Sequence, residues 1–242
     1  MQLLLDDRLA PITSEIGFLK ADCSVAARAF MEWQTPIQQR RGVSLSRRPV
    51  SGSLEDVLQT LLPLTSVEAR RYLFIPTASP WVAYLDNGHQ GTDAMSAVSY
   101  LAKRIGCEGL RVVAVPDTIV SDWGDAPGRY GATMLELYGP HDTHFLNYVR
   151  SIGVANDGGK WVFTQGGNPL PFEDLSRYKV REVRRRFTFE DLRYYLEQLG
   201  LSAFDEYFYL PAPNNQAVLF DKTGPTAPGL IEYTLSEVQA GY

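Results

Sequence analysis

Cysteine and histidine are scarce in this sequence of 242 residues, which holds two cysteines and three histidines. A disulfide-stabilised fold of the small secreted type needs several cysteine pairs, so that class is excluded. Cys23 and Cys107 lie far apart in the sequence, and we expect both to be reduced residues of the core. Any reaction that needs an imidazole group can use only His89, His141 or His144.

Long apolar runs are also lacking. The leucines at positions 3–5 are followed at once by Asp6 and Asp7, and this run is shorter than the roughly 7–15 apolar residues of an export signal. No window approaches the roughly 18 consecutive apolar residues of a membrane-spanning helix. We therefore expect a cytoplasmic protein with no membrane segment.

The common motifs for phosphate, dinucleotide and metal binding are missing, as are those for nucleophilic catalysis. The sequence has no Gly-x-x-x-x-Gly-Lys-Ser/Thr, Gly-x-Gly-x-x-Gly, Gly-x-Ser-x-Gly, Cys-x-x-Cys or His-Glu-x-x-His. A phosphate site of the P-loop type is thereby excluded, and we predict no cofactor. Because catalytic groups often converge only in the folded chain, these absences do not exclude an enzyme with dispersed residues.

What is present is the composition of a folded protein, with 45% hydrophobic, 21% charged and 12% aromatic residues. The formal net charge is -5, so we expect no broad cationic surface for nucleic acid or for an anionic membrane. No linker or break in composition divides the chain. We predict one domain over residues 1–242, in which an N-terminal helical part (about 1–65) packs on a sheet-rich part (about 66–222), with a tail at 223–242.

Apolar spacing and capping signals predict four helices, at 23–33, 54–62, 94–105 and 189–199. Asp22 is the expected N-cap of the first helix, which Pro36 should end or kink. Residues 38–50 are expected to form an exposed loop. Aromatic and β-branched runs predict strands at 72–75, 81–85, 110–115, 132–138, 145–155, 161–164, 204–210 and 216–220. The turn Asn156-Asp157-Gly158-Gly159 predicts a β-hairpin.

Successive strands often follow each other without a helix between them, which favours antiparallel pairing. Only the strand at 81–85, the helix at 94–105 and the strand at 110–115 have the spacing of a parallel crossover. We therefore predict an α+β fold, with a mixed, mostly antiparallel sheet and about four helices packed mainly on one face.

The segment from Gly88 to Asp93 is a candidate site, because it runs from the end of a predicted strand into the start of a helix. His89 could act there as a general base or a ligand contact, with Asp86 or Asp93 as the acid. Backbone N–H groups at a helix start favour anions, but Asp86 and Asp93 already bring negative charge to this place. An ordinary capped turn is the competing interpretation.

His141-Asp142-Thr143-His144 offers two imidazole groups at positions i and i+3, which would share one face of a helix and could bind a metal ion. Gly139-Pro140 precedes the segment and its neighbours are predicted strands. A polar turn between two strands is therefore favoured over a metal site at His141 and His144.

Two further segments are candidates for binding. Asp122, Trp123 and Asp125 lie in a long loop, where an exposed tryptophan beside acids could anchor a basic partner, or Trp123 could pack over the sheet edge. Residues 177–193 are basic, and Arg184 and Arg186 with nearby aromatic residues could hold nucleic acid or an acidic protein partner. An ion-paired surface is favoured there, because the rest of the chain is acidic and would repel nucleic acid.

Three classes of function remain. The first is a non-catalytic binding protein, of the kind that bacteria use as intracellular immunity or antitoxin-like partners, in which acidic loops capture a basic partner. The alternative is a hydrolase or transferase with dispersed residues around Gly88–Asp93. The third, a nucleic-acid-associated regulator, rests on the arginine cluster alone. An enzyme requires that His89 and at least one of Asp86, Asp93 or His141 meet in one concave pocket.

Overall fold

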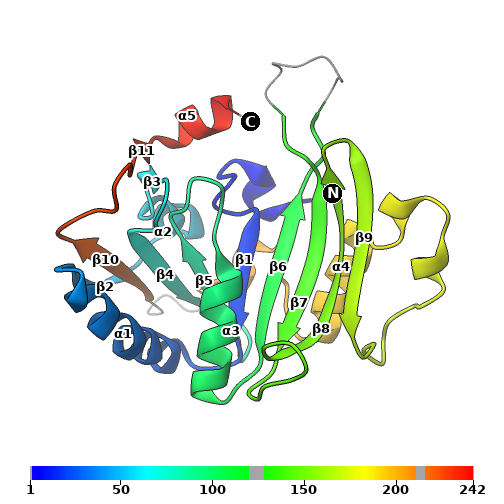
Figure 1. Ribbon diagram of the computed structural model, residues 1–242, viewed down its shortest axis with the longest axis horizontal. Coiled ribbons are helices and arrows are strands. Elements are labelled where there is room, and N and C mark those ends of the chain that lie inside the picture. The colour runs from blue at the N-terminus through cyan, green and yellow to red at the C-terminus, as the bar shows by residue number, and fades with distance from the viewer. Residues whose placement is uncertain (1, 120–127, 211–215, 242) are drawn as a thin grey trace.

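A nine-stranded sheet forms the centre of the molecule in the computed structural model, which describes residues 2–119, 128–210 and 216–241 (Figure 1). All neighbouring strands are antiparallel, in the order β2-β10-β4-β5-β1-β6-β7-β8-β9. The strands are β1 (Glu15–Leu19), β2 (Ser44–Val50), β4 (Arg71–Pro76), β5 (Val82–Asp86), β6 (Gly109–Val115), β7 (Ala132–Tyr138), β8 (Tyr148–Asp157), β9 (Lys160–Gly167) and β10 (Ala217–Thr223).

The helices and a small second sheet surround this centre. The helices are α1 (Cys23–Arg40), α2 (Leu54–Gln59), α3 (Ala94–Ile105), α4 (Phe189–Gln198) and α5 (Leu235–Ala240). Single 3-10 turns are η1 (Leu4–Asp7), η2 (Arg177–Lys179), η3 (Val183–Arg185) and η4 (Glu206–Phe208). Strand β3 (Leu64–Thr65) pairs with β11 (Glu232–Tyr233) in the second sheet.

The central strands are buried on both faces of the sheet, whereas the edge strands β2 and β9 are mostly exposed. Successive side chains of a strand point to opposite sides. Tyr72 and Phe74 of β4 face α1, where Phe30 packs against their rings at centroid distances of 4.9 and 5.4 Å. Leu73 and Ile75 face the other side, in a core shared with α2 and α4. Helices α1 and α3 lie on the near face in Figure 1, with α4 behind the sheet.

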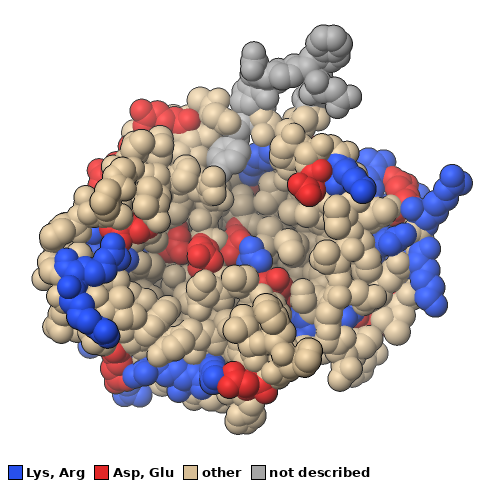
Figure 2. All heavy atoms as spheres, in the orientation of Figure 1, with Lys and Arg blue, Asp and Glu red and all other residues tan. Residues whose placement is uncertain are grey.

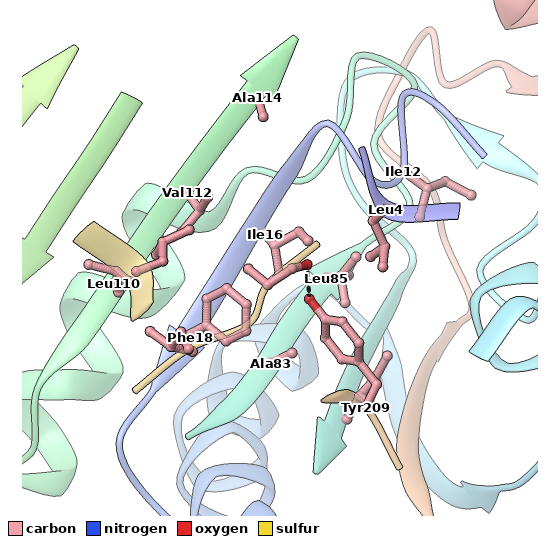
Figure 3. Close-up of a cluster of buried hydrophobic side chains, with 14 of the residues drawn as sticks. Leu4, Ile12, Ile16, Phe18, Ala83, Leu85, Leu110, Val112, Ala114 and Tyr209 are labelled. Carbon is pink, nitrogen blue, oxygen red and sulfur yellow. Dashed lines mark hydrogen bonds between the residues drawn. The ribbon is translucent and has the colours of Figure 1, made fainter. Parts of the chain in front are cut away.

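The core on the far face is mainly aliphatic (Figure 3). Alternate residues of three central strands meet there, with Ile16 and Phe18 from β1, Ala83 and Leu85 from β5, and Leu110, Val112 and Ala114 from β6. Leu4 and Ile12 close it at one end. Tyr209 is also buried there, and its hydroxyl group donates a hydrogen bond of 2.7 Å to the carbonyl oxygen of Ala203.

Strands β5 and β6 both pair antiparallel with β1, which lies between them, so they run parallel to each other. Helix α3 connects them and crosses β1. The parallel crossover predicted from 81–115 is therefore present, with a third strand inserted into it. This arrangement brings the start of α3 to the end of β5, where the candidate segment Gly88–Asp93 lies.

Helix α3 sits close to the sheet because two strand positions facing it carry no side chain. A Cβ atom at Gly17 of β1 would lie 2.5 Å from Cγ2 of Val98, and one at Gly109 of β6 would lie 2.7 Å from Cγ1 of the same residue. Real Cβ atoms do not approach other atoms so closely. The two glycines therefore set the height of α3 above the sheet.

The predicted α+β class with a mostly antiparallel sheet is confirmed. The prediction that the helices pack mainly on one face is wrong, because α1 and α3 cover one face while α2 and α4 cover the other. Residues 1–65 contribute β1 and β2 to the sheet as well as helices. The capping boxes of α2 and α4 are present, and Gly158 and Gly159 form the hairpin turn with φ of 58° and 93°.

Two predicted segments are wrong. Residues 38–50 are not a loop, because α1 continues through Pro36 to Arg40 and residues 44–50 form β2. Pairing with β10 overrides their weak strand propensity. Residues 204–210 do not form a strand but contain η4, which Asp205 caps by accepting a hydrogen bond from the backbone N–H of Tyr207.

The two cysteines are not linked to each other in the structure. Cys23 and Cys107 are both free and partly buried, and burial raises the pKa of each thiol to about 11. In the described part of the chain, no helix has the length and apolar character needed to cross a bilayer.

Replacing Gly17 with alanine should lower the free energy of unfolding by about 1–3 kcal/mol, because the new methyl group overpacks the contact with Val98. Urea denaturation measures this change. Combining Gly17→Ala with Val98→Ala should destabilise the protein by less than the sum of the single changes. Gly166→Ala is the matched control, since a Cβ atom there meets nothing within 4 Å. Additive effects of the two single changes would contradict this account.

Candidate functional site

A hollow of about 500 Å³ opens on the near face of the sheet, between α1, the segment 65–69 and the start of α3. Figure 2 shows this face, with acidic side chains gathered in the recessed area above α1. The lining residues are Phe30, Trp33, Gln34, Thr65, Val67, Glu68, Ala69, Tyr72, Tyr84, Asp86, Gly88, His89, Gln90, Gly91, Asp93, Ser96 and Ala97.

Asp86 organises the connection between β5 and α3. Its Oδ1 accepts a hydrogen bond of 3.0 Å from the backbone N–H of Gly88, and its Oδ2 accepts one of 3.1 Å from that of Asp93. The hydroxyl group of Tyr84 donates a longer bond of 3.4 Å to the same Oδ2. The backbone N–H of Asp86 in turn donates to Thr92 Oγ1. These bonds fold residues 86–93 into a compact turn at the edge of the hollow.

Asn87 fixes this turn to the neighbouring chain. Its Oδ1 accepts hydrogen bonds from the backbone N–H groups of Arg70 and Arg71, and its Nδ2 donates to the carbonyl oxygen of Pro63. The next residue must be glycine, because a Cβ atom at Gly88 would lie 2.6 Å from the carbonyl oxygen of Gly91. The turn is therefore rigidly held on the side away from α3.

His89 lies on the rim of the hollow and is partly buried. Its backbone N–H donates to the carbonyl oxygen of Thr65, and its ring stacks on Tyr233 of β11 with centroids 5.4 Å apart. The segment that contains β11 thus helps to position the imidazole group.

Two backbone N–H groups at the start of α3 donate to carboxylates of the protein. Asp93 N–H donates to Asp86, and Ala94 N–H donates to Glu15 Oε1 of β1 at 2.8 Å. These two groups are therefore not available to a phosphate or another anion. Glu15 also pairs with Arg111, which binds Glu136 on its other side.

Burial shifts the ionisation of several groups in and beside the hollow. It raises the pKa of Asp86 to about 7, against the lowering effect of the hydrogen bonds from Gly88 and Asp93. Burial also lowers the pKa of Lys222, on β10, to about 8. The pKa of Glu68 is lowered despite its burial, because Ala227 N–H, Lys222, Arg70 and Arg41 stabilise its charged form.

Aromatic rings form much of the wall between the acidic groups. Phe30 and Trp33 come from α1, Tyr72 from β4 and Tyr84 from β5. Trp33 is partly buried and stacks on Tyr100 of α3, with centroids 4.4 Å apart. The hollow therefore combines aromatic side chains with the carboxylates of Asp86, Asp93 and Glu68.

Three of the residues predicted for a site meet in this hollow, namely His89, Asp86 and Asp93. His141 does not join them. It lies with His144 in the exposed connection between β7 and β8, where Asp142 pairs with Lys103 of α3. That connection is a polar turn, and the described residues contain no group of three or more His, Cys, Asp and Glu side chains placed to hold a metal ion.

The other predicted binding residues lie elsewhere. Asp122, Trp123 and Asp125 are outside the described residues. Arg184 pairs with Glu182, and Arg186 donates from Nε to the carbonyl oxygen of Val180 while its guanidinium group lies 5.7 Å from the ring centroid of Phe163. Arg184 is thus ion-paired, as the sequence favoured for this segment, whereas Arg186 contacts a carbonyl oxygen and an aromatic ring.

Sequence reasoning missed most of the wall of the hollow. Trp33 lies in the predicted helix at 23–33 and Tyr72 in the predicted strand at 72–75, and neither was predicted as part of a site. Nothing local in the sequence indicates that they face the segment 88–93. Strand β1 was not predicted either, and with it the contact between Glu15 and the start of α3 was missed.

No protein-family model, curated protein or solved structure matches this chain.

The contribution of Asp86 to the free energy of unfolding should fall as the pH rises from 5 to 7. The folded state holds this proton up to about pH 7, whereas an unfolded aspartate releases it near pH 4, so the folded state binds more protons in this window. Urea denaturation of the wild type and of Asp86→Asn across pH 5–8 measures the difference. The wild type should lose up to about 1.4 kcal/mol per pH unit relative to the variant. Equal slopes would contradict the raised pKa.

Proposed function

We propose that this chain is a non-catalytic binding protein that captures a basic protein partner, in the manner of intracellular immunity or antitoxin-like proteins. The hollow at the start of α3 receives an arginine or lysine side chain of that partner. The observation that carries the proposal is the lining of the hollow, which places aromatic rings and three carboxylates around one space of about 500 Å³.

Both parts of this lining favour a cation over other ligands. The face of an aromatic ring attracts a guanidinium or ammonium group, and a carboxylate in a partly buried site does so more strongly. The carboxylate of Asp93 is exposed and forms no hydrogen bond or ion pair within the described part of the chain. The net charge of -5 would also steer a basic partner toward the molecule.

Exposed apolar side chains at and beside the hollow could be covered by a protein partner. Val67, which lines the hollow, is 69% exposed, and Ile231, which lies outside its lining, is 53% exposed. They are held together by Ser66, which donates its backbone N–H to the carbonyl oxygen of Ile231 and accepts the N–H of Ile231 at Oγ. Val67 has a φ of 62°, a costly conformation for a β-branched residue, and such strain is often found at functional sites.

A catalytic role is the second candidate, because His89, Asp86 and Asp93 do meet in one hollow. A carboxyl group with a pKa of about 7 suits a general base at neutral pH. Both oxygens of Asp86, however, accept hydrogen bonds from the turn that it organises. This engagement favours a fixed electrostatic role for Asp86 over proton transfer to a substrate.

The peptide acetyl-Gly-Arg-Gly-amide should bind in the hollow and shift the NMR signal of the Trp33 indole N–H, which a Trp33→Phe variant assigns. The same peptide with citrulline in place of arginine has nearly the same shape without the charge, and it should bind much more weakly. Asp93→Asn should weaken binding by roughly fivefold, since one such charge contributes on the order of 1 kcal/mol near a surface.

Asp157→Asn is the matched control for Asp93→Asn, because it removes one exposed carboxylate at the hairpin between β8 and β9. It should leave peptide binding unchanged. Equal binding of the arginine and citrulline peptides would overturn the proposed cation site. Cleavage of the peptide by the wild type but not by His89→Gln would favour the catalytic candidate instead.

A further inference from the structure

We propose that the cationic group entering the hollow displaces the proton of the Asp86 carboxyl group, so that the partner binds more tightly as the pH rises toward neutrality. This inference rests on the proposed function, because it requires that the occupant be a cation. It assigns to Asp86 the role of a buried counter-ion that becomes charged only when the site is filled.

The position of Asp86 supports this role. The residue is 3% exposed and stands at the end of β5, where it lines the hollow. Hydrogen bonds from Gly88, Asp93 and Tyr84 hold its two oxygens in place, so the carboxyl group cannot turn out toward water. These neutral donors offset only part of the cost of burying a charge on Asp86, so a cation in the hollow would stabilise that charge further.

Asp86 forms no ion pair with any residue that the structure describes, although several basic side chains lie nearby. Arg111 is held by Glu15 and Glu136. Lys222 donates to the carbonyl oxygen of Ala69 at 2.9 Å and lies 4.0 Å from Glu68. The resident cations of this region thus serve other carboxylates.

The other ionisable groups around Asp86 mostly oppose its charge. Tyr84 on the same strand and Tyr72 on β4 are buried aromatic neighbours whose hydroxyl pKa values are raised above 10. Glu15 on β1 and Asp93 at the start of α3 raise the pKa of Asp86 by repulsion. Other ionisable groups at the hollow or behind it are His89 on the turn, Glu68 on the segment 65–69 and Lys222 on β10. Arg41 and Arg70 pair with Glu68.

The proton balance follows from this environment. In the empty hollow, burial keeps the pKa of Asp86 near 7, so the carboxyl group is largely protonated below that pH. A guanidinium or ammonium group in the hollow lowers that pKa, and the O–H bond of the carboxyl group breaks with release of the proton to the solvent. Linkage then requires the affinity for the cation to rise by up to about tenfold per pH unit below pH 7 and to level off above it.

The test measures the affinity for acetyl-Gly-Arg-Gly-amide by the Trp33 indole signal at intervals from pH 5.5 to 8.5. The wild type should bind more tightly with each step up to about pH 7, and the dependence should be absent in Asp86→Asn. The His89→Gln variant should retain it, which separates Asp86 from the imidazole group that lines the same hollow. As a readout that needs no variant, the ¹³C signal of the Asp86 carboxyl group should titrate at a lower pH when the peptide is present.

The possible outcomes separate the two proposals. Peptide binding with an affinity that is independent of pH, or an unmoved Asp86 titration, would overturn proton displacement while leaving the cation site intact. A pH dependence that disappears in His89→Gln would also overturn it. Failure of the arginine peptide to bind better than the citrulline peptide at every pH would instead overturn the proposed function.

Discussion

The close contact between α3 and the sheet is the constraint on which the rest of this structure depends. Gly17 and Gly109 let Val98 approach two strands at once, and the height of the helix above β1 follows from that contact. Because the turn 86–93 connects β5 to α3, the same contact determines where that turn lies. The hollow lies where the turn, α1 and the segment 65–69 meet beside this closely packed helix.

Burial decides which groups of this region are charged as much as ion pairing does. Glu15 caps the start of α3 and shares Arg111 with Glu136, which satisfies three charges in one network. Asp86 lies beside that network but receives only neutral donors. Removing a carboxylate from water costs several kcal/mol when no cation accompanies it. Burial therefore raises the pKa of Asp86 to about 7, and the hollow carries less negative charge below that pH than its sequence suggests.

The elements that could be predicted from the sequence are those whose signals are local. Thr188 and Asp191 cap α4 as their spacing predicts, and Gly158-Gly159 turns the hairpin, because each signal involves residues a few positions apart. Strand β2 could not be found this way, since its only partner is β10, far along the chain. The residues of the candidate site also fall into a local group and a group from distant parts of the chain. Asp86, His89 and Asp93 lie in one short segment and were identified together, whereas Trp33, Tyr72 and Glu68 reach it only through the order of the strands. The capping box at Thr234 and Glu237 is local and was missed.

The place of β10 in the sheet has a consequence for how the chain acquires its structure during synthesis. This strand is inserted between β2 and β4, so it provides the hydrogen-bonding partner of β2 and one of the two partners of β4. A ribosome releases the chain from its N-terminus, and residues 44–50 emerge long before residues 217–223. During that interval the arginine-rich strand β2 has no neighbour and the inner edge of β4 is uncovered. Strand β2 therefore stays without a partner for most of synthesis. It carries Arg47, Arg48 and Pro49, which are residue types that discourage pairing between the edges of different chains.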